Sequence, residues 1–169
     1  MSSSDDGERY VLDSCVVIDF CGRTDNLQHL IAHVGDAALI TSAVEDELKR
    51  LREKQFPFLS KFFELVECGK VQVADPDIAN ETAERIISKW TRSFGAGEVS
   101  SAALAASRGW IFVSQDLEPM RQLRLSETIF METTSDILKS LTRQRAITKQ
   151  QATEIQAAIR RSSKPRRRR

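Results

Sequence analysis

Short apolar runs of strand length alternate with longer amphipathic segments along most of this 169-residue chain. The runs are rich in aliphatic and aromatic residues and are bounded by Gly, Asp or Ser, a composition typical of buried strands. The longer segments carry apolar residues at helical spacing, as at Leu27, Leu30, Ile31 and Val34. Strands that alternate with helices favour a three-layer α/β/α domain with a mainly parallel central sheet.

The pattern also predicts where the elements and the parts of the chain begin and end. The expected strands are a run from Tyr10 that stops at Asp13, then Ala37–Thr41, Val71–Ala74, Trp110–Ser114 and Thr128–Met131. The expected helices are Asn26–Val34, one that begins at Ser42, Pro57–Cys68, Asn80–Arg92, Glu98–Arg108 and a short one to about Leu123. Ser42 and Glu45 match a capping box, and Thr148 has the position of an N-cap in a later helical hairpin. The chain then divides into a flexible N-terminus (1–8), the α/β domain (9–135), a helical extension (136–162) and a basic disordered tail (163–169).

Several features together predict a cytoplasmic protein with no membrane partner. No apolar run approaches the roughly 18 residues that a membrane span needs, and the polar start MSSSDDGER does not resemble a secretory signal. The three cysteines, Cys15, Cys21 and Cys68, include no CxxC pair, which favours reduced, packed thiols over zinc binding or disulfides. His29 and His33 lie one helical turn apart, and the pattern favours surface histidines over metal ligands.

The formal net charge of +1 hides an uneven distribution of charge. Residues 1–138 carry 14 basic and 23 acidic side chains, a net charge of −9, whereas residues 139–169 carry 11 basic and one acidic, a net charge of +10. An acidic body with a basic end is typical of a nucleic-acid-binding protein, and a solvated tail is the simpler alternative. We expect phosphates to be bound at the basic end by Arg160, Arg161, Lys164, Arg166, Arg167, Arg168 and Arg169.

Acidic residues lie at the ends of the expected elements, where open α/β sheets bind their ligands. Asp13 and Asp116 follow strand-like runs, and Glu98 follows the glycine-containing segment FGAG at the start of a helix. If the fold gathers these carboxylates, their repulsion requires bound cations, and oxygen ligands favour Mg²⁺ or Mn²⁺ over zinc. Taken singly, each acid also fits a helix cap or a surface position, and the helix dipole alone favours Glu98 in a first turn.

A fourth acid comes from the run Glu45, Asp46 and Glu47. At 100° per residue, Glu47 lies about 65° from the apolar face centred near Val44, Glu45 about 95° from it, and Asp46 almost opposite. Because Glu45 is also assigned to the capping box, the geometry favours Glu47 as the acid that turns towards the core.

The chain resembles the PIN-domain nucleases over roughly residues 9–135. Four stretches carry this resemblance in order and spacing, namely VLDSCVVID, ITSAVEDEL, GAGEVSSAALA and IFVSQD. The resemblance places the acids of the family on Asp13, Glu47, Glu98 and Asp116, and the supporting hydroxyl residues on Ser14 and Ser114. Two departures are that Ser114 stands where Thr is commoner, and that Leu117 follows Asp116 where a further acid is sometimes found.

Membership of this family implies divalent-metal-dependent hydrolysis of RNA phosphodiester bonds. In that mechanism Asp13 and Asp116 bind Mg²⁺ or Mn²⁺ directly, and Glu98 binds the metal or orients a metal-bound water. Glu47 binds metal or holds water from the rim of the site. The basic tail is not part of the family pattern, and its expected partner is RNA.

Within the family, the chain most resembles the VapC-type toxins of bacterial toxin–antitoxin pairs. That resemblance implies a cognate antitoxin protein as partner and a homodimer. The alternative is a non-cleaving PIN-like module that binds RNA or protein. A haloacid-dehalogenase-type phosphatase is disfavoured because that chemistry needs a second Asp at the position of Cys15, and a P-loop is excluded because no GxxxxGK[ST] motif occurs.

Overall fold

A parallel β-sheet lies at the centre of the computed structural model, which describes residues 7–52, 56, 58–115 and 117–163. Within these residues the sheet has five strands in the order β3-β2-β1-β4-β5, and every neighbouring pair is parallel. The strands are β1 (Tyr10–Leu12), β2 (Ala38–Ile40), β3 (Gln72–Val73), β4 (Ile111–Val113) and β5 (Phe130–Glu132). The predicted α/β class with a parallel central sheet is therefore confirmed.

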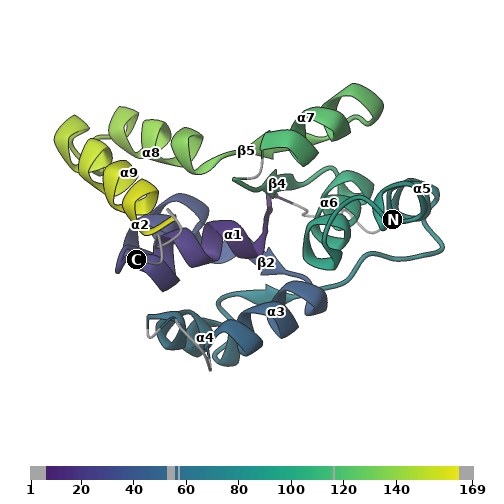
Figure 1. Ribbon diagram of the computed structural model, residues 1–169, viewed down its shortest axis with the longest axis horizontal. Coiled ribbons are helices and arrows are strands. Elements are labelled where there is room, and N and C mark those ends of the chain that lie inside the picture. Colours follow the sequence, from purple (N-terminus) through teal and green to yellow (C-terminus); the bar gives the residue numbers. More distant parts are fainter. Residues whose placement is uncertain (1–6, 53–55, 57, 116, 164–169) are drawn as a thin grey trace, which may run out of the picture.

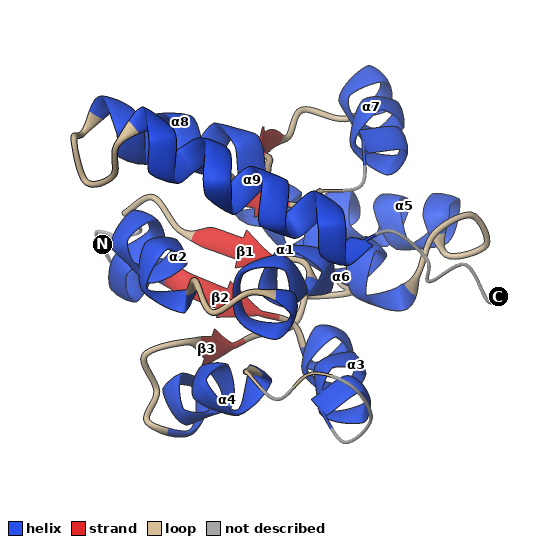
Figure 2. Cartoon of the chain, turned by 60° about the vertical axis from the view of Figure 1, so that its left-hand side comes forward, coloured by secondary structure: helices blue, strands red, loops and turns tan. Residues whose placement is uncertain are grey.

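Helices cover both faces of this sheet, which gives three layers (Figures 1 and 2). Between β1 and β3 the chain forms α1 (Ser14–Val17), the π-helix η1 (Ile18–Arg23), α2 (Leu27–Val34), the 3-10 turn η2 (Gly35–Ala37), α3 (Ser42–Arg52) and α4 (Leu59–Glu67). After β3 it forms α5 (Glu81–Trp90), α6 (Ala96–Arg108), α7 (Leu117–Ser126), α8 (Thr134–Arg143) and α9 (Lys149–Ser163). In Figure 1 the helices α5 and α6 lie on the opposite side of the strands from α1, α2 and α9.

Alternate strand residues face two separate apolar cores, as a side-chain period of two requires. In β1, Leu12 packs with Leu30 of α2 in one core, whereas Val11 packs with Leu104 of α6 in the other. The small residues of α6, including a run of buried alanines, let this helix lie close to the sheet. Both faces of the central strands are therefore covered, which is the usual arrangement of a parallel sheet.

The hairpin of α8 and α9 contributes to the same core as α1 and α2. Ile137 and Leu141 of α8 and Ile155 and Ile159 of α9 are buried in the cluster that also contains Phe20. Thr148 caps α9 as predicted, because its Oγ1 accepts the Gln151 N–H at 3.1 Å. The 136–162 segment thus packs directly onto the α/β core.

Some predicted bounds and one predicted cap differ from the structure: α6 begins at Ala96, not Glu98, for example. The last strand begins at Phe130, not Thr128. The predicted capping box of Ser42 and Glu45 does not form, because the Ser42 hydroxyl donates to Asp75 and Thr41 Oγ1 instead accepts the Val44 N–H at 3.4 Å. Sequence spacing alone did not anticipate Asp75, which is supplied by the loop after β3.

Among the described residues, no helix is long and apolar enough to cross a membrane.

If the hairpin is part of the core, Leu141→Ala should lower the free energy of unfolding by about 2–5 kcal/mol, because it leaves a cavity beside α9. The same substitution at Leu125, which is 82% exposed on α7, should change stability by less than about 0.5 kcal/mol. Urea unfolding followed by circular dichroism measures both values. A Leu141→Ala variant as stable as the Leu125→Ala variant would contradict this packing.

Candidate active site

The crevice between β1 and β4 is where this topology places a ligand. The helices after β1 pack on one face of the sheet, through residues such as Leu30, and α7 after β4 packs on the other, through Leu123. Two adjacent parallel strands whose connections leave on opposite faces form a topological switch point, and ligands bind outside the carboxyl ends of such strands. Asp13 directly follows β1, and Ser114 directly follows β4.

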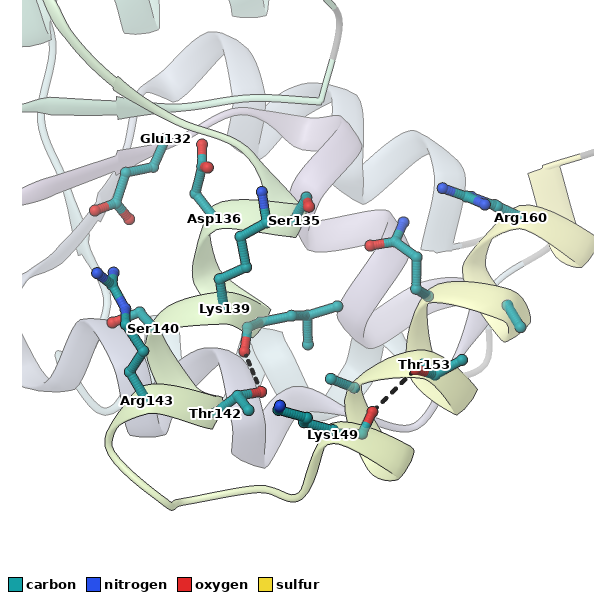
Figure 3. A pocket seen from close by; sticks show the side chains of 14 residues that line it. Glu132, Ser135, Asp136, Lys139, Ser140, Thr142, Arg143, Lys149, Thr153 and Arg160 are labelled. Carbon is teal, nitrogen blue, oxygen red and sulfur yellow. Dashed lines mark hydrogen bonds between the residues drawn. The ribbon is translucent and has the colours of Figure 1, made fainter.

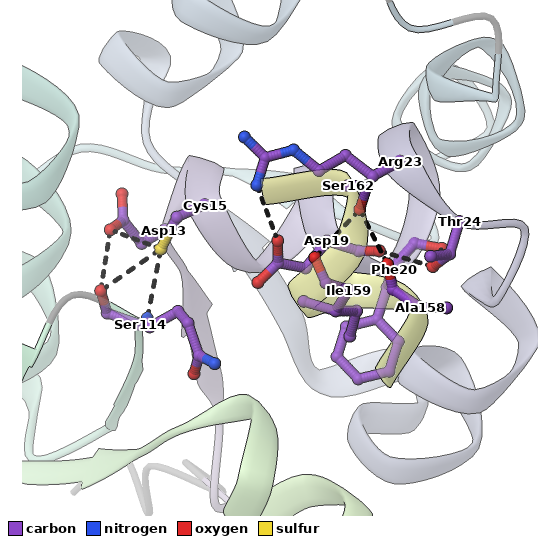
Figure 4. A network of polar contacts seen from close by, with 11 residues as sticks. Asp13, Cys15, Asp19, Phe20, Arg23, Thr24, Ser114, Ala158, Ile159 and Ser162 are labelled. Atoms are coloured by element: carbon purple, nitrogen blue, oxygen red, sulfur yellow. Dashed lines mark hydrogen bonds and ion pairs between the residues drawn. The ribbon is translucent and has the colours of Figure 1, made fainter. Parts of the chain in front are cut away.

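Asp13 is held at this point by hydrogen bonds from both strand ends (Figure 4). Its N–H donates to the Val113 carbonyl at 2.9 Å, which continues the β1–β4 pairing beyond the strands. Its Oδ1 accepts the Ser14 N–H at 2.8 Å, so Asp13 is also the N-cap of α1. Its Oδ2 accepts the Ser114 hydroxyl at 2.9 Å and the Cys15 thiol at 3.3 Å.

Asp13 is 1% exposed, and its environment disfavours the ionised form of its carboxyl group. Burial raises the pKa of Asp13 above its usual value, the hydrogen bonds from Ser114, Cys15 and Ser14 oppose that effect, and the charge of Glu47 raises the pKa further. A bound cation would reverse this balance, because it favours the ionised carboxylate.

Glu47 of α3 turns towards the same region, as the helix geometry predicted. Its side chain is half-buried whereas that of Asp46 is exposed, and its charge acts on Asp13. Gly97 in the first turn of α6 makes room for it: a Cβ atom on Gly97 would lie 3.0 Å from Glu47 Oε2 and 3.2 Å from Val44 Cγ2. A side chain at position 97 would therefore displace the Glu47 carboxylate or separate α3 from α6.

The other two predicted acids have different outcomes. Glu98 is half-buried in the first turn of α6, next to Gly97. Asp116 lies outside the described residues. In the described part of the chain, no group of three or more His, Cys, Asp or Glu side chains is arranged to hold a metal ion. Asp13 and Glu47 are thus brought together, and the predicted set of four acids stays a prediction.

The residues that are present fit a hard divalent cation in donor type. Asp13 and Glu47 offer carboxylate oxygens, which Mg²⁺ and Mn²⁺ prefer. Among the described residues, Asp13 Oδ2 accepts the Ser114 hydroxyl and the Cys15 thiol, whereas Oδ1 accepts only the Ser14 N–H and so keeps a lone pair for a cation. The residues that would hold the cation are Asp13 and Glu47, with Glu98 and Asp116 as further candidates from the sequence pattern.

The two supporting serines act in different ways. Ser114 contacts Asp13 through its hydroxyl, as predicted, whereas the bond from Ser14 comes from the backbone N–H. Cys15 is a contact that the sequence pattern did not single out: its thiol donates to Asp13, and its sulfur accepts the Gln115 N–H at 3.2 Å. Burial raises the pKa of the Cys15 thiol, so it stays protonated as a donor. Cys15 and Cys21 are at least half-buried, whereas Cys68 is exposed and not packed as expected.

The prediction of surface histidines is wrong for His33. Its side chain is 5% exposed, its Nε2 lies 2.7 Å from Glu132 Oε2, and its ring packs edge-on against Tyr10. Glu132 ends β5, so the contact joins α2 to an edge strand. His33 therefore has a structural partner in Glu132.

Asp19 is a second buried acid that sequence reasoning missed. It lies in the π-helix η1, its carboxylate is 3.4 Å from Arg23 Nη1, and Figure 4 shows the pair beside Ser162 of α9. The Thr24 hydroxyl donates to the Asp19 carbonyl at 2.6 Å and so satisfies a backbone group near the helix end. Burial raises the pKa of Asp19 to about 6, against the opposing effect of Arg23.

Comparison of the chain with protein-family models and with curated proteins finds no match in either.

Asp19 should make the protein less stable as the pH rises. Its folded pKa of about 6 lies above the ordinary value of 3.8, so the folded state binds more protons than the unfolded state between these values. Relative to Asp19→Asn, the wild type should lose up to about 3 kcal/mol of stability between pH 4 and pH 7. Urea unfolding of both proteins across this range measures the difference.

The matched control is Asp25→Asn, at an exposed carboxylate two residues beyond the same π-helix. Between pH 4 and pH 7, the wild type should not lose stability relative to Asp25→Asn as it does relative to Asp19→Asn. A pH-independent difference between the wild type and Asp19→Asn would contradict the assignment of a raised pKa to Asp19.

Proposed function

We propose that this chain is a divalent-metal-dependent endoribonuclease, and that it is the toxin of a toxin–antitoxin pair. The observation that carries the proposal is the buried Asp13 carboxylate at the β1–β4 switch point, with Glu47 turned towards it. A buried carboxylate with a second acid nearby is best explained by a cation ligand. The position of Asp13 after β1 and the four sequence stretches that resemble PIN nucleases both support the proposal.

The roles of the residues follow from their environment. When bound, Mg²⁺ or Mn²⁺ would activate a water molecule and stabilise the leaving oxygen of the phosphodiester. Asp13 would hold the cation through Oδ1, while Ser114 and Cys15 fix the orientation of Oδ2. Glu47 would bind the cation or hold water from the side of α3, and Asp116 and Glu98 would complete the ligands.

An acidic site repels the phosphate backbone of its substrate, so affinity for RNA has to come from other residues. Arg160 and Arg161 are exposed near the end of α9. The remaining basic residues proposed to bind RNA lie outside the described residues, namely Lys164, Arg166, Arg167, Arg168 and Arg169. An antitoxin and a second copy of the chain are the protein partners that this function implies.

Asp13→Asn should reduce Mg²⁺- or Mn²⁺-dependent cleavage of single-stranded RNA by at least about 100-fold, because it removes the ligand charge while keeping the side-chain shape. Asp116→Asn should have the same effect. The measurement is the rate of cleavage of a labelled RNA, with and without a chelator.

The matched control is Asp46→Asn, at an exposed acid on α3 beside Glu47, which should cleave at the wild-type rate. Growth arrest on expression of the wild type but not of Asp13→Asn would support the toxin assignment. Undiminished cleavage by Asp13→Asn would refute the site. A protein that Mg²⁺ stabilises but that turns over no RNA would favour the non-cleaving alternative.

A chain that ends at Ser163 should bind RNA with a weaker dependence on salt, because five cations of the tail no longer displace counterions. The slope of log K against log salt should fall by up to about 3.5 for single-stranded RNA. Fluorescence anisotropy over a salt series measures the slope. The control is a full-length variant in which Lys70 and Arg92, both exposed on the acidic body, are replaced by alanine. An equal slope for the full and shortened chains would show that the tail does not bind RNA.

A further inference from the structure

A groove of about 980 Å³ runs between α8 and α9 (Figure 3). Its base is aliphatic and includes Leu138 of α8 and Ala152 and Ala157 of α9. Small side chains such as Ser135 and Thr153 also line it, so another backbone can approach the two helices closely. The helical hairpin therefore presents an apolar trough where a third helix can pack.

Basic side chains surround this trough. Lys139 and Arg143 come from α8, and Lys149 and Arg160 come from α9. All four are exposed, and none forms an ion pair with a residue in the described part of the chain. The groove thus combines aliphatic side chains with four cations that form no ion pair among the described residues.

The two acids that line the groove are already engaged by other groups. Glu132 Oε2 lies 2.7 Å from His33 Nε2. Asp136 accepts both the N–H and the hydroxyl of Thr133, at 2.9 and 3.0 Å, in the capping box of α8. Both acids keep their negative charge, so the described lining of the groove, with four cations and two acids, has a net positive charge.

A second hollow of about 620 Å³ extends the groove towards α7. It shares Asp136 and Lys139 with the first hollow and adds Arg121, Arg124 and Leu125. Leu125 is 82% exposed and lines this hollow together with the two arginines. The basic and apolar surface is therefore continuous from α7 to the end of α9.

We propose that this groove docks an amphipathic helix of a partner protein, with apolar residues on one face and acidic residues along both flanks. The apolar face would cover Leu138, Ala152 and Ala157, and the flanks would pair with the four cations of the rim. This inference does not depend on the proposed RNA cleavage: of the described residues given a role there, Arg160 alone lines the groove, and the variants below leave it unchanged.

Charge alone would also suit RNA, but the side chains in the groove favour a peptide. Single-stranded nucleic acids are bound by aromatic side chains on which bases stack, together with basic grooves that follow the phosphates. No aromatic residue is among the described residues that line either hollow. The aliphatic side chains on the floor of the groove match leucine or isoleucine side chains of a helix. They give a nucleobase no ring to stack on and a phosphate no hydrogen-bond donor.

The test uses the full chain and three fluorescent probes. The first is a helical peptide of roughly 18 residues, about 27 Å long, with Leu on one face and Glu on the flanks. The second has the same composition with the leucines spread around the helix. The third is a single-stranded oligouridylate. Anisotropy gives the affinities, and backbone NMR shifts locate each probe on α8 and α9.

The wild type should bind the amphipathic peptide at least about tenfold more tightly than the rearranged peptide, because only the first buries its leucines. The double variant Lys139→Glu, Arg143→Glu should weaken this binding at least about tenfold. Lys139→Gln, Arg143→Gln should weaken it less. The control Lys70→Glu, Arg92→Glu makes the same change in net charge on exposed residues elsewhere and should alter the affinity less than about twofold.

Three outcomes would overturn the proposal. One is equal affinity for the two peptides, or binding to neither. Another is an equal loss of affinity in the groove and control variants, which would mean that net charge alone attracts the peptide. The third is that the oligouridylate, and not the peptide, shifts the groove resonances and binds more weakly to the Lys139 and Arg143 variants. The groove would then be a nucleic-acid-binding surface.

Discussion

The hydrogen bonds between the ends of β1 and β4 determine how the candidate site is built. The Asp13 N–H donates to the Val113 carbonyl, and the Ser114 hydroxyl donates back to the Asp13 carboxylate. Both strands lie in the interior of the sheet and are buried on both faces, so their ends move little relative to each other. The position of the Asp13 carboxylate is therefore set by the sheet and not by the conformation of a loop.

The approach of α3 to α6 is the second constraint, and it follows from one glycine. Gly97 lies against Val44 and the Glu47 carboxylate at distances where a Cβ atom would force a shift. The Thr41 and Ser100 hydroxyls, 2.7 Å apart, join the start of α3 to α6 one turn further along. Glu47 can consequently turn towards Asp13 without breaking the packing of the two helices.

Most of the fold and part of the site could be predicted because they depend on periodicity. Alternation of strand-like and helical segments predicts a parallel sheet, and an angle of 100° per residue separates Glu47 from Asp46. The errors depend on contacts that are distant in the sequence. Ser42 bonds to Asp75, 33 residues away, and the buried His33 pairs with Glu132, 99 residues away. The hydrogen bond from the Cys15 thiol to Asp13 and the burial of Asp19 in a π-helix could likewise be found only in the packed structure. Neither feature has a periodic signal in the sequence.

The packing of the hairpin on the core fixes part of the basic end of the chain against the acidic body. α8 and α9 pack beside Phe20 and Leu30, so their basic surface holds a fixed position relative to β1. The Thr134 N–H, at the start of α8, donates at 3.1 Å to Oε1 of the Gln115 side chain. The backbone N–H of Gln115 in turn donates to the sulfur of Cys15, beside Asp13. A chain of direct contacts thus connects the basic hairpin to the buried acid.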